Sequence, residues 1–263
     1  MITRVISGSV LIAMSIGAVW FAPGWLFLLI AILLAALACR EFAALARASD
    51  LHIPGVLATI ATALTCAAFS RASFGIPLDL ALMSALVVLG SLSLASWSGG
   101  RDAVASASAA LMPVLYVGLP VGAMVGIREQ AGPQGLFLLM LTVMVSDSSQ
   151  YFVGRAFGRR PLAPRVSPKK TLEGAYGGFV CGTALLAVVG HWWLPSVPVL
   201  LRVLLGATLV ALGIAGDLFE SMLKRSAGVK DSSALIPGHG GVLDRIDALL
   251  FTAPVYYVVI THV

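Results

Sequence analysis

Charged residues are scarce in this sequence. Asp, Glu, Lys and Arg together make up 11% of the 263 residues, whereas hydrophobic residues make up 59%. With a mean hydropathy of +0.98, water cannot solvate such a chain as one globule, which excludes an ordinary soluble domain. The composition therefore predicts an integral membrane protein whose core is the helix bundle itself.

Cysteine is rare as well, and basic runs interleaved with aromatic residues are lacking. Cys39, Cys66 and Cys181 lie in apolar segments without the paired spacing of a zinc or redox motif, so they are predicted to be small buried hydrophobes. The net charge of +5 does not indicate nucleic acid, because no aromatic residues are placed for base stacking. Lipid headgroups and nucleotide phosphates are the better candidates for its partners.

Apolar runs of membrane-spanning length fill most of the chain. They are too long and continuous for barrel strands, so each is predicted to be a helix. An all-α polytopic bundle of about nine transmembrane helices follows if each span needs roughly 20 residues. The expected spans are 5–21, 25–39, 54–70, 77–96, 111–127, 135–152, 174–193, 199–222 and 242 to the C-terminus. A cleaved signal peptide is the alternative for the first run, although an Ala-x-Ala-like site is missing.

These spans divide into two regions. An N-terminal transmembrane region, 1–134, holds the first five spans. A C-terminal catalytic region, 135–263, holds the other four and a basic loop, 155–173. Of the 17 Lys and Arg residues, the nine-span arrangement puts only Arg71, Arg128 and Arg202 on one side of the membrane. Because the side richer in basic residues is the cytoplasmic one, the N-terminus and the basic loop are predicted to be cytoplasmic. Glu41 follows the second run and is predicted to be an interfacial residue at the end of that helix.

One polar stretch, 217–247, concentrates charge between two apolar runs. Four of its polar residues are spaced at i, i+3, i+4 and i+7, so they lie on one face of a helix: Asp217, Glu220, Ser221 and Lys224. A carboxylate near the membrane interior costs about 2.5–3.5 kcal/mol on insertion scales, so it needs a partner or a function. A structural salt bridge between Glu220 and Lys224 would explain those two residues. It would not explain Asp217, one turn deeper.

A Pro-Gly-His-Gly-Gly loop, 237–241, precedes the last apolar run. Its glycines would let the backbone around His239 approach a ligand, and the helix N-terminus that follows favours phosphate. A plain helix-entry turn capped by acids is the alternative. Asp244 and Asp247 lie one turn apart on the same face of the following helix.

Taken together, these two helices carry the parts that phosphoryl or nucleotidyl transfer needs. Asp217 and Asp244 come from different helices and have the oxygen ligands that Mg²⁺ prefers. Lys224, Arg225 and Lys230 add positive charge at the same place. Acids that hold a metal and bases that hold phosphate predict such a transfer.

A second polar segment, 146–178, begins with Asp147 near the end of the sixth span. Six basic residues follow in a link broken by glycine and proline: Arg155, Arg159, Arg160, Arg165, Lys169 and Lys170. An ordinary positive-inside loop is one interpretation. The run 167–171, Ser-Pro-Lys-Lys-Thr, adds two hydroxyls and a constrained turn, a combination that suits a triphosphate.

These motifs resemble the CTP:phosphatidate cytidylyltransferase family, the CDP-diacylglycerol synthases. The C-terminal signature of that family is matched in spacing by Ser221, Lys224, Arg225, Lys230, Asp231, Pro237, His239, Gly240, Gly241, Asp244, Arg245 and Asp247. Its upstream pattern is matched by Asp147, Tyr151, Gly154, Arg155, Ser167, Pro168, Lys169, Lys170, Thr171, Glu173 and Gly174. Gln150 and Leu172 stand where the family commonly has a small residue and a tryptophan. The N-terminal spans resemble the family only in hydropathy.

The resemblance implies that CTP and phosphatidic acid give CDP-diacylglycerol and pyrophosphate, with Mg²⁺ required. Asp217 and Asp244 would hold the metal, and a second cation could share them. The implied catalytic residues also include Lys224, Arg225 and His239. The implied nucleotide- and phosphate-binding residues are Ser167, Lys169, Lys170, Thr171, Glu173, Lys230, Gly240, Gly241 and Arg245. The implied supporting residues are Asp147, Ser221, Asp231 and Asp247, of which Asp247 would orient Arg245.

Three alternatives were weighed against this function. A relative that uses CTP on another lipid phosphate or a lipid alcohol would share the signature. An ion-coupled transporter would also place acids and bases in a bundle, but inverted repeats are not visible and the charges cluster toward one face. A CDP-alcohol phosphatidyltransferase would need Asp-Gly-x-x-Ala-Arg, which is absent. Spans rich in small residues permit a homodimer, and the expected location is the bacterial inner membrane with the active site facing the cytoplasm.

Overall fold

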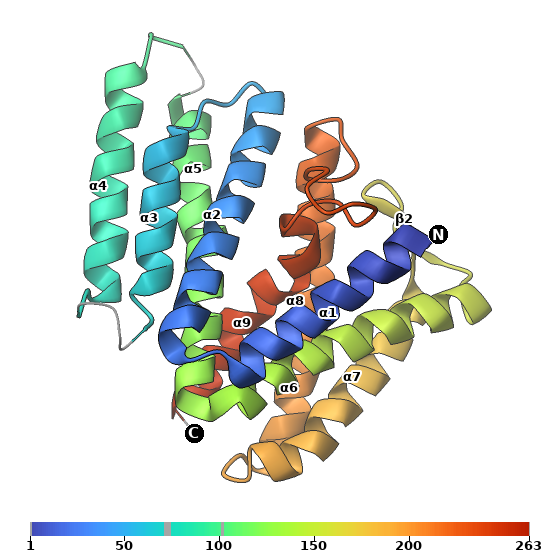
Figure 1. Ribbon diagram of the computed structural model, residues 1–263. Coiled ribbons are helices and arrows are strands. Elements are labelled where there is room, and N and C mark those ends of the chain that lie inside the picture. Colours follow the sequence, from blue (N-terminus) through green and yellow to red (C-terminus); the bar gives the residue numbers. More distant parts are fainter. Residues whose placement is uncertain (1, 71–74, 101–102, 263) are drawn as a thin grey trace.

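The protein is a bundle of helices with one small β-hairpin (Figure 1). The computed structural model describes residues 2–70, 75–100 and 103–262, with side chains from residue 6 onward. The elements are α1 (Ile2–Phe21), α2 (Gly24–Ala48), α3 (Gly55–Ala67), α4 (Leu78–Ser96), α5 (Ala103–Pro113), the π-helical turn η1 (Val114–Gly118), α6 (Leu119–Phe157), β1 (Pro161–Ala163), β2 (Ser167–Thr171), α7 (Leu172–Trp193), α8 (Val199–Ser226) and α9 (Leu243–His262). Arg71 and Arg101, which the charge count uses, lie outside the described residues, as does the side chain of Arg4.

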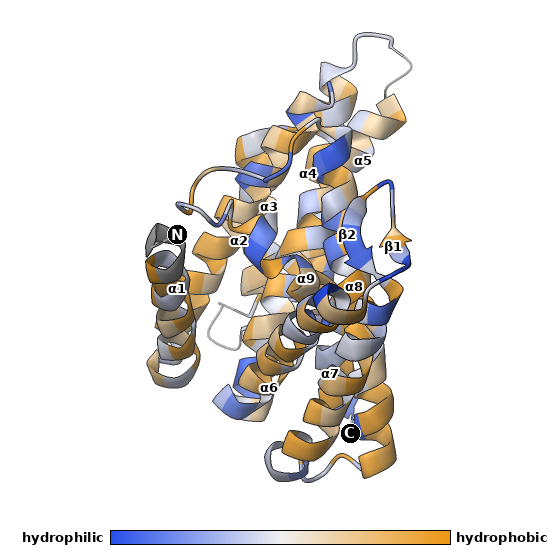
Figure 2. Ribbon diagram, turned by 90° about the vertical axis from the view of Figure 1, so that its right-hand side faces the viewer, coloured by the Kyte–Doolittle hydropathy of each residue, from blue (hydrophilic) through white to orange (hydrophobic). Residues whose placement is uncertain are grey.

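The predicted all-α membrane protein is confirmed at the level of its class. Among the residues that the structure describes, five helical stretches are long and apolar enough to cross a membrane: Gly24–Ala48, Leu78–Ser96, Ala103–Phe157, Leu172–Trp193 and Val199–Ser226. Large apolar side chains such as Phe21 and Leu94 face outward, as lipid contact requires. Figure 2 shows hydrophobic residues along most of the helices and hydrophilic residues around the hairpin.

Helix ends differ from the predicted spans in several places. The predicted spans 111–127 and 135–152 belong to one helical stretch, Ala103–Phe157, in which the backbone turns at Gly132 with φ 70°. Only glycine adopts this φ readily, and Pro133 follows it. The count of nine spans therefore stays a prediction. α2 continues to Ala48 rather than ending near residue 39, which places Glu41 inside a helix.

The basic loop 155–173 is more ordered than predicted. α6 continues through its first residues, and α7 begins at Leu172. Between them, β1 and β2 pair as antiparallel strands, with Pro161 opposite Thr171 and Ala163 opposite Ser167. No strand was predicted here, because three to five residues are too few to show an alternating pattern.

α6, α7, α8 and α9 pack against one another, and α1 crosses α6 (Figure 1). The buried face of α7 carries glycine at every fourth residue, at 174, 178, 182 and again at 190. A Cβ at Gly178 would lie 2.5 Å from Cγ of Gln150, so only glycine permits this approach of α7 to α6. The close packing places the hairpin against α8, where Lys170 of β2 contacts Asp217.

Aromatic rings join the N-terminal helices to α8 and α9. Tyr116 of η1 lies 5.2 Å from Phe219 and 6.2 Å from Phe251, measured between ring centroids, and 6.1 Å from Phe42 of α2. The first two contacts are edge-on, an arrangement that stabilises aromatic pairs. The predicted regions 1–134 and 135–263 are therefore in direct contact, and their boundary stays a prediction.

Candidate active site

A polar cavity of about 360 Å³ lies between the ends of α6, α8 and α9 and the α8–α9 loop (residues 227–242). Five acids, four bases and one serine line it: Asp147, Asp217, Ser221, Lys224, Arg225, Lys230, Asp231, Asp244, Arg245 and Asp247. Each of them belongs to the set that the sequence predicts for the site. The cavity therefore brings together charges that come from three helices and a loop.

Lys224 lies between two carboxylates. Its Nζ is 2.6 Å from Oε2 of Glu220 and 2.6 Å from Oδ1 of Asp244. The predicted salt bridge with Glu220 is confirmed, and it arises from the i, i+4 spacing along α8. The contact with Asp244 joins α8 to α9. One ammonium group thus stabilises two acids in the bundle interior.

The second oxygen of Asp244 is held by the α8–α9 loop. Oδ2 accepts hydrogen bonds of 2.8 Å each from the backbone N–H of Ser232, the hydroxyl of Ser232 and the N–H of Gly241. Gly240 has φ +78°, and a Cβ there would lie 2.6 Å from Oδ2 of Asp244. In this structure the glycines give room to a carboxylate of the protein. Their predicted role in phosphate binding stays a prediction.

Asp217 receives a lysine from the hairpin. Nζ of Lys170 in β2 lies 2.5 Å from Oδ2 of Asp217, and the hydroxyl of Ser221 donates to Oδ1 at 3.3 Å. Successive side chains of a strand point to opposite faces, so Lys169 is exposed on the other side. The structure therefore separates the two adjacent lysines that the sequence predicts as a pair.

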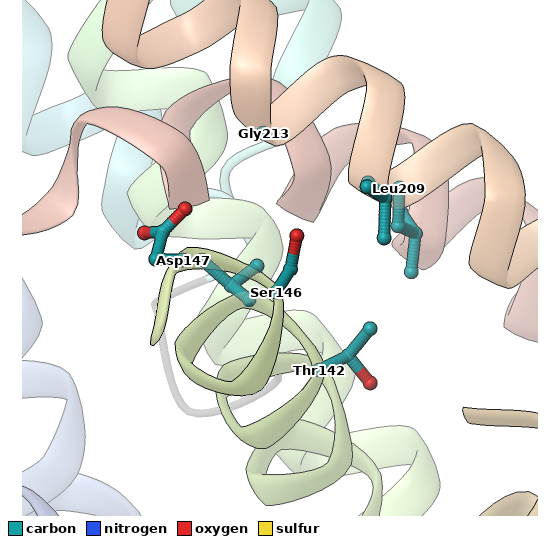
Figure 3. A pocket seen from close by; sticks show the side chains of 7 residues that line it. Thr142, Ser146, Asp147, Leu209 and Gly213 are labelled. Atoms are coloured by element: carbon teal, nitrogen blue, oxygen red, sulfur yellow. The ribbon is translucent and has the colours of Figure 1, made fainter. Parts of the chain in front are cut away.

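Asp147 lies where the cavity meets a narrow crevice between α6 and α8 (Figure 3). The crevice is lined by Thr142 and Ser146 of α6 and by Leu209 and Gly213 of α8, and it is too narrow to admit water. The side-chain amide of Gln150 donates to Oδ1 of Asp147 at 3.0 Å and to the hydroxyl of Ser146 at 3.2 Å. Gln150, which departs from the family pattern, thus orients a carboxylate of the cavity.

Several predicted phosphate-binding residues have structural contacts around the hairpin. The hydroxyl of Thr171 accepts from the N–H of Gly174 at 3.1 Å and caps the N-terminus of α7. Glu173 accepts from the N–H groups of Arg159 and Arg160, at 3.0 and 3.2 Å, and fixes the entry to β1. Ser167 begins β2. These residues position the hairpin, and none of them lines the described cavity.

His239 lies against α1. Its Nδ1 is 2.9 Å from the hydroxyl of Ser7, which also donates to the carbonyl of Pro237 at 3.1 Å. Near the cavity, Arg225 donates to the carbonyl of Val229 at 2.9 Å. Among the described residues no ion pair joins Asp247 to Arg245, and the expectation that Asp247 orients Arg245 stays a prediction. Oδ1 of Asp247 instead accepts from the N–H of Ala248 at 2.8 Å.

Sequence reasoning missed Glu41. The residue is 7% exposed and lies inside α2, which continues to Ala48, so the prediction that it stands at the end of that helix is wrong. Both of its carboxylate oxygens accept hydrogen bonds from the α8–α9 loop and the start of α9. A usable signal existed, because Ala38, Phe42 and Leu45 continue the buried face of α2 past residue 39. An acid on that face needs donors inside the protein.

The donor set fits the predicted Mg²⁺. Asp217 and Asp244 line one cavity from two helices, and carboxylate oxygens are the ligands that Mg²⁺ prefers. A lysine ammonium contacts each of them, so both already face positive charge. Within residues 2–70, 75–100 and 103–262, no three His, Cys, Asp or Glu side chains are arranged as a ready metal site. Metal binding would require Lys170 and Lys224 to release these oxygens.

Comparison with known proteins agrees with these motifs. The sequence model of the Cytidylyltransferase family matches residues 2–263. A phosphatidate cytidylyltransferase of Staphylococcus saprophyticus is 30% identical over 240 residues, which are 91% of this chain and 92% of that protein. One of Helicobacter pylori is 38% identical over 179 residues, 68% of this chain and 64% of that protein. One of Pseudomonas aeruginosa is 49% identical over 122 residues, 46% of this chain and 45% of that protein, so the chain spans about half of its length.

Proposed function

Because the chain belongs to the cytidylyltransferase family, we propose that it transfers CMP from CTP to phosphatidic acid, giving CDP-diacylglycerol and pyrophosphate. The observation that carries this proposal is the cavity. It combines acids able to hold a metal with Lys224, Arg225, Lys230 and Arg245, which are able to hold phosphate. The reaction is the one named for several bacterial relatives.

In the proposed reaction an oxygen of the lipid phosphate attacks the α-phosphorus of CTP in line. The new bond joins that oxygen to the α-phosphorus, and the bond from the α-phosphorus to the bridging oxygen breaks, so pyrophosphate leaves with the electron pair. The lipid phosphate is already a nucleophile at neutral pH, so no protein nucleophile is needed. Catalysis then depends on positioning and charge neutralisation.

Asp217 and Asp244 are proposed to hold Mg²⁺, and a second cation would share them. The ion would neutralise phosphate charge and orient the nucleotide. If Asp217 and Asp244 held the ion, Lys170 and Lys224 would be available for phosphate oxygens. The same side chains thus balance the acids before binding and the nucleotide after it.

We also propose the finer arrangement that the charge distribution predicts. The chain would cross a bacterial inner membrane about nine times, with its N-terminus and cavity in the cytoplasm. A homodimer is compatible with its helices rich in small residues. A relative that uses CTP on another lipid phosphate or a lipid alcohol remains the second candidate. An ion-coupled transporter is the third, because paired acids and lysines in a bundle would also suit a carrier.

The proposed function is tested by following the α- and γ-phosphates of labelled CTP into the products. Purified protein in lipid nanodiscs is incubated with Mg²⁺, phosphatidic acid and CTP labelled on either the α- or the γ-phosphate. We expect α-label in the lipid and γ-label only in pyrophosphate. A γ-labelled lipid would indicate a CTP-dependent kinase instead, and label retained as CTP would indicate a carrier. Diacylglycerol and a polyprenyl phosphate in place of phosphatidic acid separate the related lipid substrates.

The two adjacent lysines give a matched pair of variants. Lys170→Ala is expected to raise the KM for CTP by about ten- to a hundredfold, because a lost charge-assisted hydrogen bond costs about 1.5–3 kcal/mol. Lys169→Ala is the control, because this side chain points away from Asp217, and its effect should be much smaller. Initial rates at varied CTP measure both. Equal effects of the two variants would contradict the assignment of Lys170 to the cavity.

A further inference from the structure

Glu41 contacts four hydrogen-bond donors near the site, all of them far from it in sequence. Oε1 accepts from the hydroxyl of Ser233 at 2.7 Å and the N–H of Val242 at 3.0 Å. Oε2 accepts from the N–H of Leu243 at 2.8 Å and lies 3.0 Å from the hydroxyl of Ser232, whose single hydrogen is shared with Asp244. The donors are about 190–200 residues away in sequence and belong to the loop that precedes α9.

Hydrogen-bond donors surround the carboxylate of Glu41. Two of its donors are the N–H groups at the start of α9, where the helix dipole stabilises negative charge. Among the described residues no Lys, Arg or His forms an ion pair with it. Hydrogen bonds from these donors therefore take the place of a counter-ion, because a hydrogen bond to a carboxylate is stronger than a neutral hydrogen bond.

Glu41 and Asp244 bind the same loop, and each contacts it near both of its ends. The hydroxyl of Ser232 lies within hydrogen-bond distance of both carboxylates, 3.0 Å from Glu41 and 2.8 Å from Asp244. The N–H of Gly241 donates to Asp244, and those of the next two residues donate to Glu41. The position of Asp244 is thus set by backbone that Glu41 immobilises.

Gly241 shows how tight this arrangement is. A Cβ on this residue would lie 2.5 Å from both oxygens of Glu41 and 2.2 Å from the hydroxyl of Ser232. No such approach occurs between real atoms, so alanine would displace either the loop or Glu41. The last glycine of the Pro-Gly-His-Gly-Gly loop is therefore explained by the carboxylate from α2.

We propose that Glu41 is a positioning residue of the site. It immobilises the loop 232–243 and the first turn of α9, and thereby aims Asp244 at the cavity and at Lys224. The proposal rests on the proposed function only in that Asp244 serves the transfer reaction. The N-terminal helices would then contribute directly to the site, through α2.

Glu41→Gln tests the proposal in kinetics. Glutamine keeps the shape but replaces one acceptor oxygen by an NH₂ group, which would face N–H or O–H donors. We expect kcat to fall by about tenfold to a hundredfold, the cost of a displacement of roughly 1 Å at a site. The Mg²⁺ concentration for half-maximal rate should rise, while the KM for phosphatidic acid should not. A purely structural role would lower the amount of active protein without moving the Mg²⁺ dependence. Asp79→Asn, at an exposed acid in the first turn of α4, is the matched control.

Hydrogen exchange measures the same contact without substrate. Amides 232–243 of Glu41→Gln should exchange faster than in the unmodified protein, and those of α7 should be unchanged. Unaltered exchange in this loop together with an unaltered kcat would overturn the proposal. If the unmodified protein forms no CDP-lipid, the proposed function is refuted instead. Faster exchange of amides 232–243 in Glu41→Gln would then still support the role of Glu41 in immobilising the loop.

A double-mutant cycle isolates the contact with Gly241. Glu41→Ala and Gly241→Ala should each increase loop exchange and lower kcat. In the double variant the combined effect should be smaller than the sum of the two single effects. The reason is that Glu41→Ala removes the oxygen atoms that the new Cβ at residue 241 would otherwise meet. Full additivity would contradict a direct contact between Glu41 and Gly241, and with it the proposal.

Discussion

Asp217→Asn is expected to lower the rate of CDP-lipid formation by about 10²- to 10³-fold, the size of effect that follows when one preorganised group that stabilises charge in the transition state is removed. The substitution preserves shape and removes the charge that would hold Mg²⁺. The side chain of Asp217 is 28% exposed and its ion pair with Lys170 opens on the cavity. A pair of this kind contributes only about 0–1 kcal/mol to folding, so the variant should fold normally.

The measurement is the initial rate at saturating CTP over a range of Mg²⁺ concentrations, with thermal unfolding in parallel. Asp50→Asn serves as the control, because Asp50 is exposed in the turn after α2 and has φ 58°, which asparagine also tolerates. A near-normal rate and Mg²⁺ dependence in Asp217→Asn would contradict the metal assignment. Loss of folding in that variant would contradict the view that its ion pair is weak.

Local spacing predicted much of the site. Glu220 and Lys224 are four residues apart on one apolar helix, so their contact follows from helix geometry alone. Asp217 and Asp244 flank one loop at the ends of two apolar runs, which is why both reach the same cavity. The class of membrane protein followed from the length and hydropathy of the runs. These features depend on short stretches of sequence.

Contacts between distant segments were not predictable in the same way. Glu41 meets its donors across about 200 residues, and no local pattern specifies which loop will lie against α2. Lys169 and Lys170 are neighbours in sequence, but the short strand β2 turns them to opposite sides. The loop glycines suggested phosphate binding because glycine permits close approach. The structure shows that carboxylates of the protein make that approach.

Lys224→Met should remove activity and also destabilise the fold by about 3–5 kcal/mol, the cost of leaving a buried charge without its partner. The side chain of Glu220 is 0% exposed and that of Lys224 is 11% exposed, and the ammonium serves Glu220 and Asp244 together. Methionine fills similar volume but neutralises neither acid. We expect a clearly lower midpoint of thermal unfolding and no CDP-lipid at temperatures where the variant is folded.

A second substitution separates the two roles of Lys224. Glu220→Gln alone should keep near-normal stability, because Lys224 still pairs with Asp244. The double variant, Lys224→Met with Glu220→Gln, should regain most of the lost stability, since the fully buried charge is gone. Its activity should stay lost, because Asp244 and the nucleotide phosphates still lack the ammonium group. A double variant that regains both stability and activity would reduce Lys224 to a counter-ion for Glu220. A Lys224→Met protein of unchanged stability would contradict the role of that pair in the fold.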